Sequence, residues 1–137
     1  MLTWTYKPSN ASINSAEAVV PGAVLNSNGY YSVKTNPIPA KNLGDDIYFC
    51  IYAQMDDGSY TYSKVVDYSP SRFAYSQLAN ASVATTSKAL MVSMLNYGAE
   101  AQRFFGYKTY ALVNGSLTES QKALVKEYSS NMVDRVD

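Results

Sequence analysis

The sequence predicts an α+β fold, an antiparallel sheet or small sandwich of about five strands followed by three helices packed on it. Apolar and polar residues alternate in residues 1–68, whereas apolar residues recur at helical spacing in residues 69–137. The pattern changes at Ser69-Pro70, a serine and proline pair that is typical of a helix start. With 137 residues we predict one domain, with a β-rich part (1–68) and a helical part (69–137).

Turn residues separate the predicted strands. Residues 2–7 alternate and end before Pro8. Residues 23–27 and 30–35 flank Asn28-Gly29, the dipeptide that favours a type I′ hairpin because both of its residues take positive φ. We therefore expect a hairpin at this point.

The strand pattern is clearest in residues 46–54, where neither face is strongly polar. A strand with two apolar faces is expected in the centre of a sheet. After the Asp56-Asp57-Gly58 turn, residues 59–68 return antiparallel as a single strand. A shift of one residue in this turn would exchange the two faces, so the sequence leaves open which tyrosines are exposed.

The longest predicted helix spans residues 87–107 and forms the centre of the fold. It is apolar around most of its circumference, which predicts that it is covered on more than one side. Gly98 in its middle indicates a close approach by another backbone or a bulky ring, and Gly106 is a natural end. Thr85 or Thr86 is expected to cap its start.

Shorter helices are expected on either side of the long one. The first covers residues 72–78. The second opens at Thr118, where Thr118-Glu119-Ser120-Gln121 matches a capping box. Its apolar face is formed by Ala123 or Leu124, followed by Val125, Tyr128, Met132 and Val136.

Composition excludes several classes of function. Eleven basic and eleven acidic residues give no net charge, which argues against nucleic acid and against an anionic membrane surface. No apolar run is long enough to insert in a membrane. The chain contains no histidine and one cysteine, Cys50, so Ser-His-Asp catalysis, Cys-His catalysis, a disulfide framework and a Cys- or His-based metal site are all excluded.

Tyrosine is the one residue type in clear excess, with 13 tyrosines against 4 phenylalanines. A row of exposed rings on neighbouring strands would form a stacking platform for sugars or a hot spot for a protein partner. The alternative is that most of these rings pack in the core. The candidate ligand-binding residues on the predicted strands are Tyr30, Tyr31, Tyr48, Tyr52, Tyr60 and Tyr62.

Acidic residues offer weaker candidates. Asp45-Asp46 and Asp56-Asp57 have oxygens that could bind Ca²⁺, but neither pair follows the EF-hand pattern, and turn hydrogen bonding explains both. Glu100 is expected to pair with Arg103 or to face solvent. We therefore predict no catalytic residue, no metal and no cofactor.

Three segments together resemble a known module. They are residues 38–69 (IPAKNLGDDIYFCIYAQMDDGSYTYSKVVDYS), 94–107 (MLNYGAEAQRFFGY) and 117–133 (LTESQKALVKEYSSNMV). Their order is similar to that of an uncharacterised repeat module of large secreted or cell-surface proteins from gut-dwelling Gram-positive bacteria of the Firmicutes type. The resemblance implies an extracellular or cell-surface location within a longer chain, and no active site.

These observations predict a non-catalytic extracellular module that binds a glycan or a protein within a large bacterial surface protein. An alternative is a structural subunit or spacer of a surface filament or phage particle, which associates with identical copies through tyrosine-rich faces. A second alternative is a fragment of a hydrolase.

Overall fold

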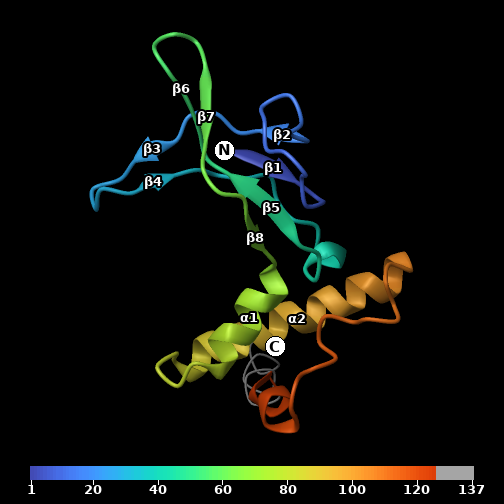
Figure 1. Ribbon diagram of the computed structural model, residues 1–137. Coiled ribbons are helices and arrows are strands. Elements are labelled where there is room, and N and C mark those ends of the chain that lie inside the picture. The colour runs from blue at the N-terminus through green and yellow to red at the C-terminus, as the bar shows by residue number, and fades with distance from the viewer. Residues whose placement is uncertain (126–137) are drawn as a thin grey trace, which may run out of the picture. The chain divides into compact units, whose positions relative to one another are not determined.

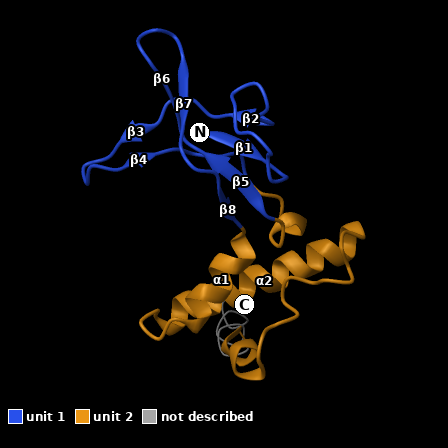
Figure 2. Cartoon of the chain, viewed as in Figure 1, with its two compact units in different colours: residues 1–37, 46–68 blue, residues 38–45, 69–137 orange. Residues whose placement is uncertain are grey.

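A computed structural model describes residues 1–125 and confirms the α+β class (Figure 1). The described residues contain eight strands in antiparallel sheets, together with helices. The chain divides into two compact units, coloured separately in Figure 2. The sheet unit comprises residues 1–37 and 46–68. The helical unit comprises residues 38–45 and the described residues from Ser69 onward.

The sheet unit is built on a four-stranded antiparallel sheet. Its strands, in the spatial order β2-β1-β5-β8, are Ala18–Val19, Leu2–Trp4, Ile47–Cys50 and Val66–Tyr68. Leu2 lies opposite Cys50 in the register, and both are buried together with Trp4. The Trp4 indole nitrogen donates a 2.8 Å hydrogen bond to the Ser15 carbonyl, so this ring is both buried and fixed in orientation.

Two further hairpins form sheets of two strands each. They are β3 (Val24–Leu25) with β4 (Tyr31–Ser32), and β6 (Tyr52–Gln54) with β7 (Tyr60–Tyr62). The hairpin predicted around Asn28-Gly29 is therefore confirmed, but its predicted type I′ turn is wrong.

The loop between β3 and β4 is longer than a type I′ turn, and the Asn26 side chain supports it. Only Gly29 has a positive φ (80°), and its amide donates to the Asn26 carbonyl at 3.1 Å. The Asn26 side-chain oxygen accepts from the amides of Asn28 and Tyr30, both at 3.0 Å. A turn followed by a left-handed glycine is the usual alternative to the type I′ hairpin.

The strand predicted over residues 46–54 is interrupted. Phe49 pairs with Val66, whereas Ile51 pairs with Ser63, whose amide donates to the Ile51 carbonyl at 2.9 Å. One residue of the first strand therefore faces two residues of the second, which is a β-bulge. The Ser63 hydroxyl accepts from the Ile51 amide and so replaces a backbone partner. The bulge divides both predicted strands, and β5 is central while β6 belongs to another sheet.

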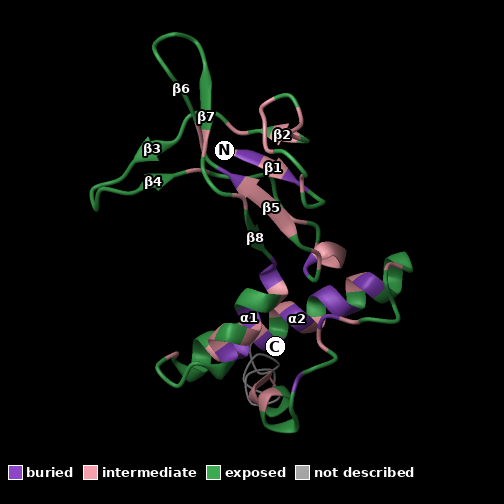
Figure 3. Ribbon diagram, in the orientation of Figure 1, coloured by how far each residue is buried: buried purple, intermediate pink, exposed green. Residues whose placement is uncertain are grey.

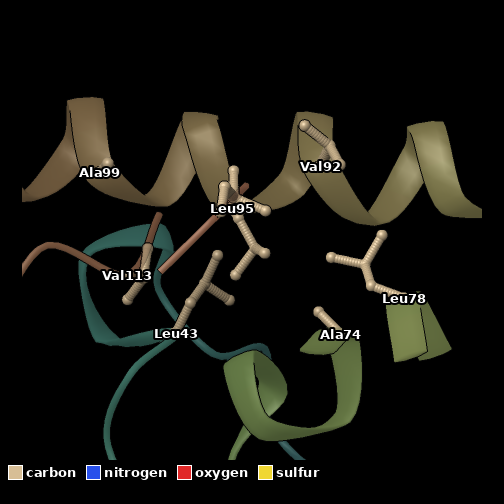
Figure 4. Packing of buried hydrophobic residues seen from close by; sticks show 8 residues of the cluster. Leu43, Ala74, Leu78, Val92, Leu95, Ala99 and Val113 are labelled. Atoms are coloured by element: carbon tan, nitrogen blue, oxygen red, sulfur yellow. The ribbon is translucent and has the colours of Figure 1, made fainter. Parts of the chain in front are cut away.

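The helical unit is organised around one long helix. Its elements are the 3₁₀ turn η1 (Ala40–Asn42), α1 (Pro70–Ala79) and α2 (Thr85–Phe105). Residues 119–125 are also helical. The core consists of Leu43, Ala74, Leu78, Val92, Leu95, Ala99, Val113 and Leu117. Figure 4 shows Leu43, Leu78 and Val113 on one side of α2, the side from which Leu95 projects.

Other parts of the chain approach α2 closely at Gly98, as predicted. A Cβ atom at this position would lie 2.8 Å from Leu43 Cδ1 and 2.9 Å from Val113 Cγ2. The Ala40 carbonyl would be 3.3 Å away. The glycine is therefore required by the packing of η1 and of the loop that contains Val113 against the helix.

Several predicted helix ends are confirmed. Gly106 ends α2 with φ of 61°, and the Tyr107 amide donates to the Gln102 carbonyl at 2.8 Å, as in a Schellman motif. The capping box is reciprocal: the Thr118 amide donates to Gln121 Oε1 at 2.9 Å and the Gln121 amide to Thr118 Oγ1 at 3.2 Å. The apolar positions predicted at Tyr128, Met132 and Val136 lie outside the described residues.

The starts of the helices differ from the prediction in detail. Ser69 and Pro70 do open α1, but the Ser69 hydroxyl donates to the Leu43 carbonyl at 3.3 Å and makes no capping bond. The residue before α2 is Ala84, so neither Thr85 nor Thr86 caps it. The helix begins two residues earlier than predicted and includes both threonines.

The outer side of α2 corrects the prediction that the helix is covered on more than one side. Leu90, Tyr97, Phe104 and Phe105 are 63–83% exposed, and Figure 3 shows exposed and buried residues alternating along α2. The buried residues of α2 share one face of the helix by their spacing, and they are Ala89, Val92, Leu95, Gly98, Ala99 and Gln102. Within the part of the chain that the structure describes, no helix is long and apolar enough to span a bilayer.

Candidate functional site

The most exposed candidate tyrosines lie on the hairpin formed by β3 and β4. Tyr30 and Tyr31 are 72% and 71% exposed. The loop between the strands is held by the Asn26 side chain, whose amide also lies 3.5 Å from the Ser32 hydroxyl. Residues 26–32 (NSNGYYS) therefore combine two exposed rings with amide and hydroxyl groups that can form hydrogen bonds.

The other four candidates lie on different sheets. Tyr48, Tyr52 and Tyr62 are partly buried against the cluster of Leu2, Trp4 and Cys50. The Tyr62 hydroxyl accepts from the Ile13 amide at 3.1 Å, which ties β7 to the first loop of the chain. Tyr60 is 39% exposed.

The Tyr60 ring contacts the Tyr52 ring across the hairpin, with a centroid distance of 6.0 Å. This cross-strand pair stabilises β6 and β7. The expectation of six tyrosines on neighbouring strands is wrong. Tyr30 directly precedes β4, and the other five are distributed over three separate sheets. Two of them, Tyr30 and Tyr31, are presented mainly to solvent.

The Asp45 carboxylate is the centre of a polar cluster in the helical unit. Its Oδ2 accepts from the Tyr107 hydroxyl at 2.7 Å and from the Asn42 side-chain amide at 2.8 Å. Its Oδ1 accepts from Lys108 Nζ at 2.7 Å. Partial burial alone would raise the pKa of Asp45, but the bonds from Lys108, Asn42 and Tyr107 outweigh this effect and lower the pKa below its ordinary value.

Lys108 completes the cluster in a strained conformation. Its φ of 45° is the only positive value at a non-glycine position among the described residues. The ion pair with Asp45 raises the pKa of Lys108. The Gln102 side-chain amide lies 3.4 Å from the Lys108 carbonyl, so α2 holds the strained backbone in place.

Protonation of Asp45 should destabilise the helical unit. Because the folded-state pKa is lowered, this contribution to stability is present above the unfolded pKa of about 4 and is lost as pH falls through the folded value. We expect Asp45→Asn to lower the free energy of unfolding by about 1–2 kcal/mol at neutral pH, and by much less near pH 3. Thermal unfolding followed by far-UV circular dichroism measures both differences.

The exposed Asp56→Asn variant is the control for this prediction, since it removes a carboxylate from the β6–β7 turn. An equal loss of stability in the Asp45→Asn variant at neutral and acid pH would show that the cluster does not depend on the charge of Asp45.

The remaining acidic candidates have structural partners. Asp57 Oδ1 accepts from the amide and the hydroxyl of Ser59 at 2.9 and 2.5 Å, and the hydroxyl bond is the main cause of a lowered Asp57 pKa. Glu100 forms an ion pair with Arg103, as predicted. No group of three acidic, cysteine or histidine side chains that could hold a metal ion occurs in residues 1–125.

Cys50 lies in the core of the sheet unit. It is 1% exposed, and burial raises the pKa of its thiol. A buried thiol with a raised pKa is a poor nucleophile.

The outer face of α2 is a surface that the sequence reasoning missed. Tyr97, Glu100, Ala101, Phe104 and Phe105 line a shallow hollow of about 260 Å³. The signal was available in the sequence, because Leu90, Met94, Tyr97, Ala101 and Phe104 recur at alternating intervals of four and three residues. This spacing led to the prediction that the helix has a second buried side.

No protein-family model, curated protein or solved structure matches this chain. The resemblance to bacterial surface modules therefore stays a prediction.

Proposed function

We propose that this chain is a non-catalytic binding module of a larger extracellular or cell-surface protein, and that it binds a glycan or a protein through the β3–β4 hairpin. The observation that carries the proposal is the exposure of two consecutive tyrosines, Tyr30 and Tyr31, beside a loop of asparagine, serine and glycine. Binding loops of antibodies have this composition, because tyrosine gives a large contact area with little loss of conformational entropy.

The hairpin geometry supports the proposal. The Asn26 side chain and the left-handed Gly29 fix the loop, so the two rings are presented from a defined backbone. A preorganised loop loses less entropy on binding. The phenol rings stack on apolar surfaces of a sugar or a protein, while their hydroxyls and the Asn26 amide form hydrogen bonds.

The carboxylates support a non-catalytic role. Among the described residues, Asp45 and Asp57 accept hydrogen bonds from neighbouring groups of the same unit. The acid in the hollow on α2, Glu100, is paired with Arg103 and largely exposed. A catalytic acid would instead be expected in a cleft that shifts its pKa.

Simultaneous replacement of Tyr30 and Tyr31 by alanine tests the proposal. On a printed oligosaccharide array and in binding assays with candidate surface proteins, we expect binding to fall by tenfold or more, because exposed tyrosines are frequent hot spots. The thermal midpoint should hardly change, since both rings are exposed.

Tyr110→Ala is the matched control, because Tyr110 is 86% exposed in the helical unit. This variant should bind like the wild-type protein. Equal binding by the double variant and the wild type would refute a role for the hairpin. Turnover of any arrayed sugar would favour the hydrolase alternative.

Self-association through the sheet unit is the second candidate function. Val24 and Leu25 on β3 are 67% and 57% exposed next to the two tyrosines, so the hairpin is apolar enough to meet an identical hairpin. In that case the double tyrosine variant would lose a concentration-dependent oligomer, and the array would remain silent.

A further inference from the structure

The outer face of α2 has the sequence spacing of a coiled-coil seam. The seam comprises Ser87, Leu90, Met94, Tyr97, Ala101 and Phe104, at intervals of three and four residues. Leu90, Tyr97 and Phe104 are 64%, 69% and 83% exposed, although buried residues of the same helix form the core of the helical unit. The helix therefore has a second apolar stripe, in which Leu90, Tyr97 and Phe104 are largely exposed. Met94 and Ala101 are partly buried, and Met94 also packs against the core.

The hollow on this face has the geometry that receives a side chain from another helix. Four of its residues, Tyr97, Glu100, Ala101 and Phe104, are related by the spacing i, i+3, i+4 and i+7. In coiled coils, four such residues form the hole into which one side chain of the facing helix inserts. The small side chain of Ala101 leaves room at the base of the hole.

We propose that this seam pairs antiparallel with the same seam of a second copy of the chain. The order of side-chain sizes along the seam fits a two-fold axis between residues 95 and 96. Leu90 of the second copy then enters the hole above Ala101, Met94 lies opposite Tyr97, and Ser87 lies opposite Phe104. Each layer combines a large with a small side chain, except Met94 with Tyr97, where a thioether meets an aromatic ring favourably.

A parallel pair fits less well. It would place Ala101 opposite Ala101, which leaves a void, and Phe104 opposite Phe104, which crowds the next layer. Antiparallel helices also bring opposite ends of their dipoles together. Side-chain size and helix electrostatics thus favour the same orientation.

The charges at the seam and the surface area that it would bury are compatible with a reversible dimer. The chain has no net charge, and Glu100 at the edge of the seam would face Ser93 of the second copy. The exposed seam residues supply roughly 400–500 Å² from each copy, which is the size of weak interfaces. The inference is independent of the proposed function, because it uses no residue of the sheet unit.

Sedimentation velocity from about 10 µM to about 1 mM tests the pairing. We expect a monomer–dimer equilibrium that is weakened about tenfold or more by Leu90→Glu or Tyr97→Glu, since each variant places a charge in the seam. Both positions are exposed, so circular dichroism should show folded variants. The Tyr110→Glu control should dimerise like the wild-type protein. A monomer at all concentrations, or a dimer unaffected by both seam variants, would overturn the proposal.

Cysteine cross-linking tests the orientation. Under mild oxidation, a mixture of the Leu90→Cys and Ala101→Cys proteins should form a mixed disulfide dimer, while each protein alone should not. The wild-type protein is the control, because its Cys50 is buried and should not react. Cross-linking of each variant with itself would indicate a parallel pair and contradict the proposed register.

Discussion

Replacing Trp4 by alanine is expected to lower the free energy of unfolding of the sheet unit by about 3–5 kcal/mol. The indole is 1% exposed in one cluster with Leu2 and Cys50, and its nitrogen donates to the Ser15 carbonyl. The variant therefore leaves a large cavity and an unpaired carbonyl in the small core of this unit. Urea unfolding followed by far-UV circular dichroism measures the change.

Two further variants serve as comparisons for Trp4→Ala. Trp4→Phe keeps a ring but removes the indole donor, so its effect should be smaller than that of alanine. Tyr6→Ala removes a ring that is 53% exposed, and it should change stability by no more than about 0.5 kcal/mol. If Trp4→Ala were as mild as Tyr6→Ala, the cluster around Trp4 would not be the core of the sheet unit.

Gln102→Leu is expected to destabilise the helical unit by about 2–4 kcal/mol, although leucine is a good helix former. Gln102 is 2% exposed on α2. Its side chain accepts from the buried Val113 amide at 2.9 Å and donates to the Ala111 carbonyl at 3.1 Å. Leucine would leave both backbone groups without these partners.

Loss of the Gln102 side chain should also weaken the hydrogen bonds of the Asp45 cluster, because this side chain lies close to the carbonyl of the strained Lys108. Nuclear magnetic resonance titration of Asp45 should give a pKa nearer its ordinary value in the variant. Arg103→Ala, which removes an exposed ion pair one residue away, should change stability by about 0.5 kcal/mol or less. Similar losses in the two variants would contradict the role of Gln102.

Local signals in the sequence predicted the fold well. Pro70, Gly106 and the Thr118 to Gln121 box each mark a helix end with chemistry that acts within a few residues. Gly98 is a further success, because a glycine in a good helical pattern indicates close packing. These signals do not depend on the rest of the chain.

Features that depend on distant partners were predicted less well. The division of residues 46–54 follows from the bulge in which Lys64 and Val65 face the single residue Cys50, which alternation within one strand does not reveal. The apolar residues Leu90, Tyr97 and Phe104 indicated a covered face, because hydrophobicity does not distinguish a core from a docking surface.

The sequence predicted which tyrosines are candidates for the site, but it did not predict which of them are exposed. Tyrosine has an apolar ring and a polar hydroxyl, so the sequence does not separate Tyr62, which packs on Trp4 and its neighbours, from the exposed Tyr30 and Tyr31. The division depends on which hairpin packs against the cluster of Leu2, Trp4 and Cys50, and this is the β6–β7 hairpin. That information comes from the three-dimensional arrangement of the strands.

Hydroxyl-radical footprinting of the intact protein at low concentration, read by mass spectrometry, tests these surfaces most directly. We expect Tyr30, Tyr31, Tyr97 and Phe104 to be oxidised rapidly, and Trp4 to be protected despite the high reactivity of indole, because Trp4 is 1% exposed. Protection of Tyr30 and Tyr31 to the same degree as Trp4 would contradict the binding hairpin, and protection of Tyr97 and Phe104 in the monomer would contradict the free face of α2.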